Sequence, residues 1–301
     1  MNKDIKWLGT NDADLYGFHG RYHDGSAAVQ YYNEQINKRK ETYPFNLPED
    51  TLKIGESLKD AGHYKIENFF NEEERALLIE IRETISRFVD TNENIKKRDN
   101  NMALVNQPIL NIPNLYKIVF NKKLIDAVTS YFGCVPAITS LAARKSFVTS
   151  APSVSNQHFH RDYNSLVKLL KVAVYLNDVD KDTGPFTYIE GSHKQMFDNW
   201  WNFHYIQDEP LKEIYGVEKI KYLTANMGDI LFADTRGFHK GLKPKSKERY
   251  ALHMCFLVHP ELSGEGHQTE NPPSNWFQIK REDYENLSED VLPAADFLRV
   301  V

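Results

Sequence analysis

The sequence predicts a mainly β fold, an antiparallel sandwich or barrel, with flanking helices. Residues 137–257 consist of short stretches rich in Val, Ile, Tyr, Phe and Thr, and Gly, Pro, Asn and Asp separate them. This is the pattern of strands joined by turns. Before them, apolar side chains recur at helical spacing in two segments. We therefore expect two helices followed by an all-β core.

Residues 1–57 are expected to form an N-terminal extension or cap, because they are polar and aromatic-rich and lack sustained periodicity. The main domain is expected over residues 58–260, beginning with a short strand at 63–66. A helix over 72–90 should follow. Asn71 and Glu74 precede and open it with the spacing of a capping box.

The second helix is expected over residues 124–132, with Ile125, Val128 and Phe132 on one face and Gly133 as its left-handed end. The all-β region then contains six predicted strands, at residues 144–149, 166–176, 186–189, 219–223, 230–233 and 250–257.

Two further segments are assigned from their position and composition. Residues 192–227 form a long, aromatic-rich insertion that we interpret as a lid. The C-terminal tail, residues 261–301, is expected to pack on the barrel through Trp276, Phe277 and Tyr284.

Composition narrows the class of protein. The 301 residues carry a formal charge of −5, which gives no basic surface for nucleic acid or for an anionic membrane. No apolar stretch approaches the roughly 20 residues that span a bilayer. Residues 1–20 lack the apolar core of a secretory signal, so the expected location is cytoplasmic. Cys134 and Cys255 have no Cys-x-x-Cys or Cys/His context, which disfavours disulfides and structural zinc. The expected partner is a small molecule.

A candidate metal site begins with His160 and Asp162. Residues two apart on a strand point to one face, so these two side chains can lie together, and His239 from a distant strand can join them. Two imidazoles and one carboxylate hold Fe(II) on one side of an octahedron and leave positions open, as in non-haem oxygenases. We predict that His160, Asp162 and His239 bind the iron, with no catalytic residue beyond these ligands.

Arg249 is the candidate anchor for a co-substrate. A short turn after His239 and a returning strand would bring it back beside the metal. Its planar guanidinium can make two parallel hydrogen bonds to the distal carboxylate of 2-oxoglutarate, which Lys would match poorly. Lys145 is the next candidate for this role.

Three neighbours of these residues invite interpretation. His158 shares strand parity with His160, so it either lines the substrate entrance or packs. Asp234 and Arg236 precede His239 and suit a pair that orders its loop.

The order of these motifs resembles the phytanoyl-CoA dioxygenase family. The resemblance extends over residues 58–257 and includes Gly62-His63-Tyr64, the helix that begins near Asn71, the His-x-Asp pair, Thr183 to Lys194 with its Gly-Pro and Gly-Ser-His-Lys, and Gly228-Asp229-Ile230-Leu231-Phe232. Glu190 stands where the family usually has Pro.

The resemblance implies a double-stranded β-helix (jelly-roll, cupin-like) core. It also implies Fe(II), 2-oxoglutarate and O2 as cofactors and co-substrates, with release of succinate and CO2. Hydroxylation of a small polar metabolite is the expected reaction. Asp162 at the carboxylate position disfavours the halogenating relatives, which have a small residue there.

Two alternatives stay open at this point. His158-x-His160 could begin the metal site of a cupin-type enzyme or sugar-binding module, although no Glu follows at residues 163–167. A metal-free scaffold could keep the fold without activity. The intact His160, Asp162, His239 and Arg249 argue against the scaffold.

Overall fold

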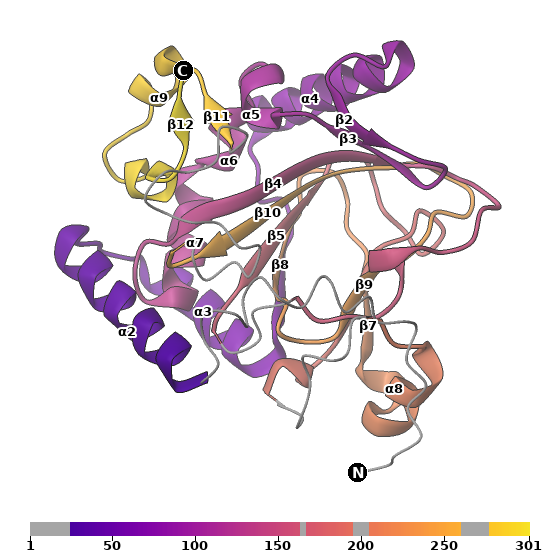
Figure 1. The fold of residues 1–301 in the computed structure, drawn as a ribbon, viewed down its shortest axis with the longest axis horizontal. Coiled ribbons are helices and arrows are strands. Elements are labelled where there is room, and N and C mark those ends of the chain that lie inside the picture. Colours follow the sequence, from indigo (N-terminus) through magenta and orange to yellow (C-terminus); the bar gives the residue numbers. More distant parts are fainter. Residues whose placement is uncertain (1–24, 163–166, 195–204, 260–276) are drawn as a thin grey trace.

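Two β-sheets face each other in the computed structural model, which describes residues 25–162, 167–194, 205–259 and 277–301 (Figure 1). The larger sheet has the strand order β1-β8-β5-β10-β4-β3-β2, and the smaller has the order β7-β6-β9. All pairings in these two sheets are antiparallel. Their strands are β1 (His63–Ile66), β2 (Ile95–Arg98), β3 (Met102–Val105), β4 (Ala137–Ser146), β5 (Leu170–Tyr175), β6 (Phe186–Ile189), β7 (Ile220–Leu223), β8 (Ile230–Asp234), β9 (His239–Gly241) and β10 (Arg249–Leu257).

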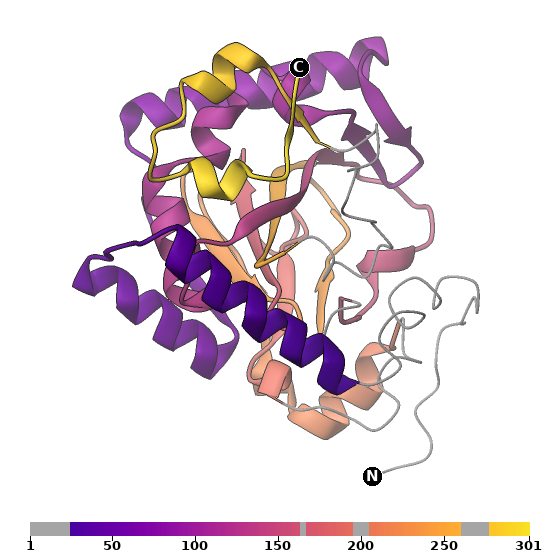
Figure 2. The ribbon, with the colours of Figure 1, turned by 60° about the vertical axis from the view of Figure 1, so that its left-hand side comes forward.

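Helices cover the side of the larger sheet that faces away from the smaller one (Figures 1 and 2). Their apolar faces and the outward side chains of the sheet form one large core. These helices are α2 (Gly25–Thr42), α3 (Glu49–Ala61), α4 (Glu72–Thr91), α5 (Pro108–Asn111), α6 (Leu115–Val119), α7 (Lys122–Phe132) and α9 (Arg281–Glu285). Helix α8 (Asp208–Tyr215) lies apart from them, and its Leu211 belongs to a separate small cluster.

The two predicted helices are confirmed as α4 and α7. The Asn71 side chain accepts a hydrogen bond from the Glu74 backbone N–H at 2.9 Å, and the Glu74 carboxylate accepts one from the Asn71 N–H at 2.8 Å. These two bonds form the capping box. Gly133 ends α7 with φ of 74°, a left-handed conformation that glycine adopts without a Cβ clash.

The prediction of two helices before an all-β core was too simple. Helices α2, α3, α5 and α6 were missed, as were the short strands β2, β3 and β9. Long-range contacts stabilise α2, since Arg39 donates to the carbonyl oxygens of Val135 at 2.5 Å and Pro293 at 2.6 Å. Such contacts leave no periodic signal in the sequence of α2 itself.

The six predicted strands all exist, with changed ends. Residues 186–189 match β6, whereas β4 begins at Ala137 instead of residue 144. Strand β5 begins at Leu170 rather than at residue 166, and β10 begins at Arg249, which places the candidate co-substrate anchor in the sheet.

The two faces of the larger sheet differ in chemistry. Outward side chains such as Val172, Val174 and Leu252 belong to the large core under the helices. Ala173 and Ala251 point the other way, into a smaller apolar cluster between the two sheets. Alternation along a strand therefore assigns the odd-numbered residues of β5, and those of β10 up to Cys255, to the interior of the barrel. After the register shift between Cys255 and Phe256, Leu257 belongs to the large core.

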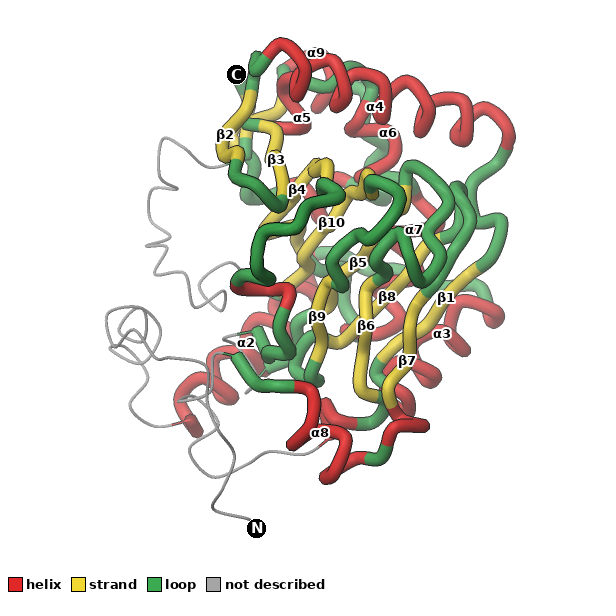
Figure 3. The backbone as a smooth tube through the Cα atoms, turned by 90° about the vertical axis from the view of Figure 1, so that its right-hand side faces the viewer, coloured by secondary structure: helices red, strands yellow, loops and turns green. Residues whose placement is uncertain are grey.

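The segments beyond the barrel are only partly described. Helix α8 lies at one end of the smaller sheet (Figure 3), whereas residues 195–204 of the expected lid lie outside the described residues. In the tail, β11 (Gln278–Ile279) pairs in parallel with β12 (Arg299–Val300). Phe277 and Tyr284 pack against the large core, and Trp276 lies outside the described part. No helix among the described residues is long and apolar enough to cross a membrane.

Candidate metal centre

The structure brings His160, Asp162 and His239 together. One ligating atom from each lies within 4.8 Å of the other two. His160 and His239 face each other across an isolated antiparallel bridge, with N–H to carbonyl bonds of 3.0 and 2.9 Å. The Asp162 N–H donates to the Thr235 carbonyl at 3.0 Å. The segment that carries the His-x-Asp pair is therefore extended, although it forms bridges rather than the regular strand that we expected.

Both histidines present the same nitrogen to the centre. Nδ1 of His160 donates to the His158 carbonyl at 2.9 Å, and Nδ1 of His239 donates to the Gly237 carbonyl at 3.0 Å. This hydrogen bond leaves Nε2 of each neutral ring with a free lone pair. Burial lowers the pKa of both imidazoles, that of His239 well below its ordinary value. Nε2 of His239 is buried and has no hydrogen-bond partner.

Asp162 completes the centre as a carboxylate. Its Oδ1 lies 3.9 Å from Nε2 of His160 and 3.7 Å from Nε2 of His239. Its Oδ2 forms an ion pair with Nζ of Lys171 at 2.9 Å. Burial alone would raise the pKa of Asp162, but Lys171 and the two histidines outweigh it and hold the pKa well below its usual range. Two neutral nitrogens and one ionised oxygen form a donor set that suits Fe(II).

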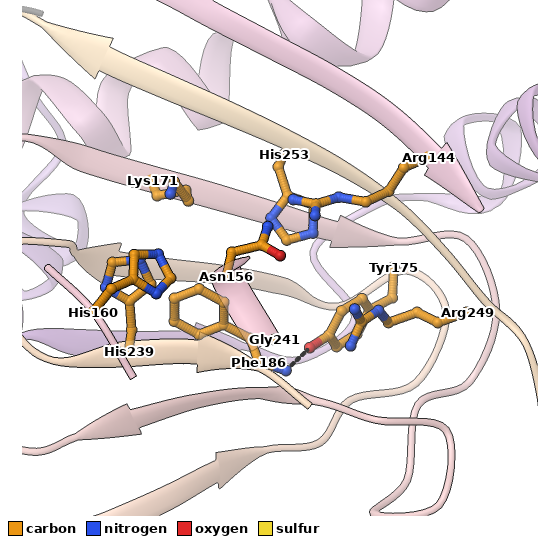
Figure 4. A pocket seen from close by; sticks show the side chains of 10 residues that line it. All are labelled: Arg144, Asn156, His160, Lys171, Tyr175, Phe186, His239, Gly241, Arg249 and His253. Atoms are coloured by element: carbon orange, nitrogen blue, oxygen red, sulfur yellow. Dashed lines mark hydrogen bonds between the residues drawn. The ribbon is translucent and has the colours of Figure 1, made fainter. Parts of the chain in front are cut away.

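A pocket extends from the two histidines to Arg249, and Figure 4 shows the side chains that line it. Arg249 is 5% exposed. Its Nη1 donates to the Leu242 carbonyl at 3.2 Å and its Nη2 to the Ser146 hydroxyl at 3.4 Å, whereas its buried Nε has no partner. These two bonds hold the guanidinium in place. Because both are long, the guanidinium can still bind an anion.

Small and aromatic residues shape the floor of this pocket. The Phe186 ring stacks on the His239 ring at a centroid distance of 5.3 Å. The Tyr175 hydroxyl accepts from the Phe186 N–H at 2.8 Å, as the dashed line in Figure 4 shows. A Cβ on Gly241 would lie 3.4 Å from Nη2 of Arg249. A Cβ there would be in ordinary van der Waals contact with the guanidinium, so only a side chain longer than that of Ala would press against it.

A buried network holds the loop before His239. Asp234 is fully buried and forms an ion pair with Arg236 at 2.5 Å, and its Oδ2 also accepts from the hydroxyl of Tyr131. Arg236 in turn donates to the Tyr131 hydroxyl at 3.1 Å. This arrangement agrees with the prediction that Asp234 and Arg236 order the loop.

His158 does not reach the metal centre, although strand parity allowed it. A 3-10 turn over Ser155–Gln157 precedes it, and its Nε2 bonds to the Ser153 carbonyl at 3.2 Å. It lines a second pocket, on the side of Lys240 and Pro244. The alternative cupin-type ligand pair, His158 with His160, therefore lacks its geometry.

Lys145 is also excluded from the pocket as the fallback anchor. Its ammonium pairs with Glu248 at 2.8 Å and lies 5.3 Å from the ring centre of Tyr250. The pocket is lined instead by its neighbour Arg144, together with Lys171 and His253. Our sequence reasoning missed these three residues. Strand parity shared with Arg249 could have identified His253.

Comparisons with known proteins agree with this geometry. The model of the phytanoyl-CoA dioxygenase (PhyH) family matches residues 58–250. No curated protein matches.

Similar solved structures share the fold. The epimerase SnoN, in complex with Fe3+, alpha ketoglutarate and nogalamycin RO, has a TM-score of 0.56 at 14% identity, covering 69% of this chain and 83% of that one. The carbocyclase SnoK from nogalamycin biosynthesis has a TM-score of 0.52 at 17% identity, covering 70% and 84%. EctD from S. alaskensis has a TM-score of 0.52 at 15% identity, covering 70% and 79%. These similarities assign the double-stranded β-helix fold to the chain.

Proposed function

The chain belongs to the phytanoyl-CoA dioxygenase family of iron- and 2-oxoglutarate-dependent enzymes, and we propose that it hydroxylates a small polar metabolite. The reaction would consume O2 and 2-oxoglutarate and release succinate and CO2. The bound iron would supply the oxidising power that cleaves an unactivated C–H bond. The protein's own residues would bind the iron, orient the substrates and exclude water from the site.

The convergence of His160, Asp162 and His239 is the observation that supports this proposal most strongly. Both imidazoles are held with Nε2 toward the centre, and one of these nitrogens is buried without a partner. An unpaired buried polar atom costs about 1 to 3 kcal/mol, and a metal ligand bond would remove that cost. Three protein ligands leave three octahedral positions for co-substrate and O2.

Arg249 supports the choice of 2-oxoglutarate as co-substrate. It begins β10, lies in the same pocket as the two histidines and has an unpaired Nε. A dicarboxylate that reached from the metal to this guanidinium would span the pocket. The Tyr175 and Phe186 side chains would flank its chain and exclude water from it.

The polarity of the lining supports a polar substrate. Arg144, Asn156 and His253 line the pocket beside the metal ligands. Tyr163 and Asn164, which the sequence also suggested as polar neighbours, lie outside the described residues.

Anaerobic titration tests the proposal without knowledge of the substrate. Fe(II) and 2-oxoglutarate together should give the wild-type protein a visible charge-transfer band, and Asp162→Ala should abolish that band. Lys145→Gln, which removes a cation that pairs with Glu248 outside the pocket, serves as a control and should keep it. A wild-type protein that binds Fe(II) but gives no band with 2-oxoglutarate would contradict the proposed co-substrate.

A further inference from the structure

A group of cationic and imidazole side chains lines the inner face of the larger sheet beside the metal centre (Figure 4). The strand register orders them. Arg249 lies opposite Ser146, Arg144 lies opposite Ala251, and His253 lies opposite Ala142. The next inward position of β10, Cys255, pairs with Lys171 of β5. Arg144 and His253 therefore lie between the co-substrate anchor and the lysine that contacts Asp162.

These two side chains have unused hydrogen-bonding atoms. His253 is 7% exposed, and neither of its ring nitrogens has a partner. Burial, followed by the nearby guanidinium of Arg144, lowers the pKa of His253 well below its ordinary value, so the ring is neutral and offers one N–H donor. Nε of Arg144 is buried and unpaired as well. Buried polar atoms of this kind normally have a partner.

Space is available next to them. Along the register, His253 is flanked by Ala142 on β4 and Ala173 on β5, and Arg144 faces Ala251. Three alanines leave the inner wall open around the two polar side chains. The wall could therefore admit a ligand group without displacing a large side chain.

The charges of the pocket point to an anion. None of the ten described residues that line it is acidic, and the nearby Asp162 is paired with Lys171. If Fe(II) and the 2-oxoglutarate dianion bind as proposed, their charges cancel, and those of Lys171 and Asp162 cancel. The positive charges of Arg144 and Arg249 then remain. Uncompensated charge in a buried site is costly, so the loaded pocket should attract a further anion.

We propose that the substrate carries a carboxylate, which Arg144 and His253 bind on the inner wall of the larger sheet. This inference rests on the proposed function and narrows its substrate class. A guanidinium matches a carboxylate with two parallel hydrogen bonds, and the imidazole N–H can add a third. Arg249 remains the anchor of the co-substrate. Arg144 is then a residue that determines specificity.

The first measurement separates the two arginines. The Fe(II) charge-transfer band gives the half-saturating concentration of 2-oxoglutarate for each variant. Arg249→Gln should raise it by about 30-fold or more, whereas Arg144→Gln should raise it by less than about 5-fold. Lys145→Gln is the matched control, because this neighbouring cation points to the opposite face, and it should change nothing. An equal loss in Arg144→Gln and Arg249→Gln would assign both arginines to 2-oxoglutarate and overturn the proposal.

The second measurement tests the anion directly. Protein loaded with Co(II) and N-oxalylglycine is titrated with a panel of small carboxylic acids and their primary amides, and ligand-observed NMR reports binding. At least one acid should bind about 10-fold more tightly than its amide, and Arg144→Gln should remove this preference. A wild-type protein that binds no acid better than its amide overturns the proposal. Failure of the proposed function is distinguishable, since it would already appear as a missing charge-transfer band.

Discussion

The ion pair between Lys171 and Asp162 predicts that Lys171→Met binds a divalent metal more tightly than the wild-type protein. The ammonium lies 2.9 Å from one oxygen of a carboxylate that also faces both histidines. A dication bound to that carboxylate would lie about 5 Å from the ammonium, given a metal to oxygen bond of about 2.1 Å. At an effective dielectric constant of about 20, the repulsion between them amounts to roughly 7 kcal/mol as an upper bound.

Two further effects must be compared with this repulsion. Without Lys171, the metal-free protein holds a largely buried carboxylate with no cation of its own, which favours metal binding further. The loss of the ion pair with Oδ2 loosens the orientation of Asp162 and opposes binding by about 1 to 3 kcal/mol. If only half of the repulsion is expressed, the balance still favours the variant. We expect a dissociation constant for metal that is about 10-fold lower, because the middle of this balance is about 1.5 kcal/mol and about 1.4 kcal/mol corresponds to a factor of ten.

Calorimetric titration of metal-free protein with Co(II) measures this dissociation constant. Thermal unfolding provides a second measurement, since the metal-free variant should be less stable than wild type and should gain more stability from metal. Lys145→Met is the control, because its ammonium pairs with Glu248 away from the pocket. Weaker Co(II) binding by Lys171→Met would refute the reasoning. It would show that Lys171 acts mainly by orienting the carboxylate.

Three other predictions concern co-substrate binding and stability. Arg249→Ala should raise the half-saturating concentration of 2-oxoglutarate in a succinate-release assay by about 30-fold or more, with Arg249→Lys rescuing it only in part; unchanged saturation would place the anchor elsewhere. Asp234→Asn should lower the free energy of unfolding by about 2 to 4 kcal/mol in urea, because it weakens a fully buried partner of Arg236; a loss below about 1 kcal/mol would contradict this. The metal-free protein should lose stability as pH falls below about 6.5, because folding lowers the pKa of the His239 and His253 imidazoles and unfolding lets them take up protons. The loss should reach up to about 1.4 kcal/mol for each of these two residues at pH 5.5. Unfolding curves that coincide at pH 7.5 and 5.5 would refute this prediction.

The sequence was enough to predict helix α4 and the shared face of His160 and Asp162. Helix α4 has a capping box and a regular apolar stripe, and both are local features of the sequence that do not depend on tertiary contacts. His160 and Asp162 were expected on one face because alternation requires only an extended backbone. That condition holds although the segment forms isolated bridges.

Alternation did not determine what the His158 side chain contacts. The His158 backbone is extended, with φ of −99° and ψ of 156°, and the rings of His158 and His160 both lie near Tyr205, at centroid distances of 6.5 and 5.8 Å. Nε2 of His158 nevertheless bonds to the Ser153 carbonyl, just before the 3-10 turn over Ser155–Gln157. The sequence of this turn contains turn formers, but the partner that it offers His158 depends on local geometry that alternation does not describe.

Arg144 and Lys171 could not be assigned from the sequence because their roles depend on strand register. A shift of one residue in β4 would exchange Arg144 for Lys145 on the inner face. The predicted strand began at residue 144, and the true strand begins at Ala137, so the phase of its inward and outward alternation could not be read from the sequence. Pairing with β10 supplies that phase, since Ser146 lies opposite Arg249.

The division of the larger sheet into an apolar and a polar face explains how the fold tolerates its site. The outward face packs against the helices in the large core and provides most of the hydrophobic stabilisation. The inward face holds Arg144, Arg249 and His253 with buried nitrogen atoms that lack partners, which is destabilising for the protein alone. Anions and metal that complete these contacts bind only the folded chain, so they should stabilise it. Ligand binding should therefore supply the partners that the buried nitrogen atoms of the inner face lack in the protein alone.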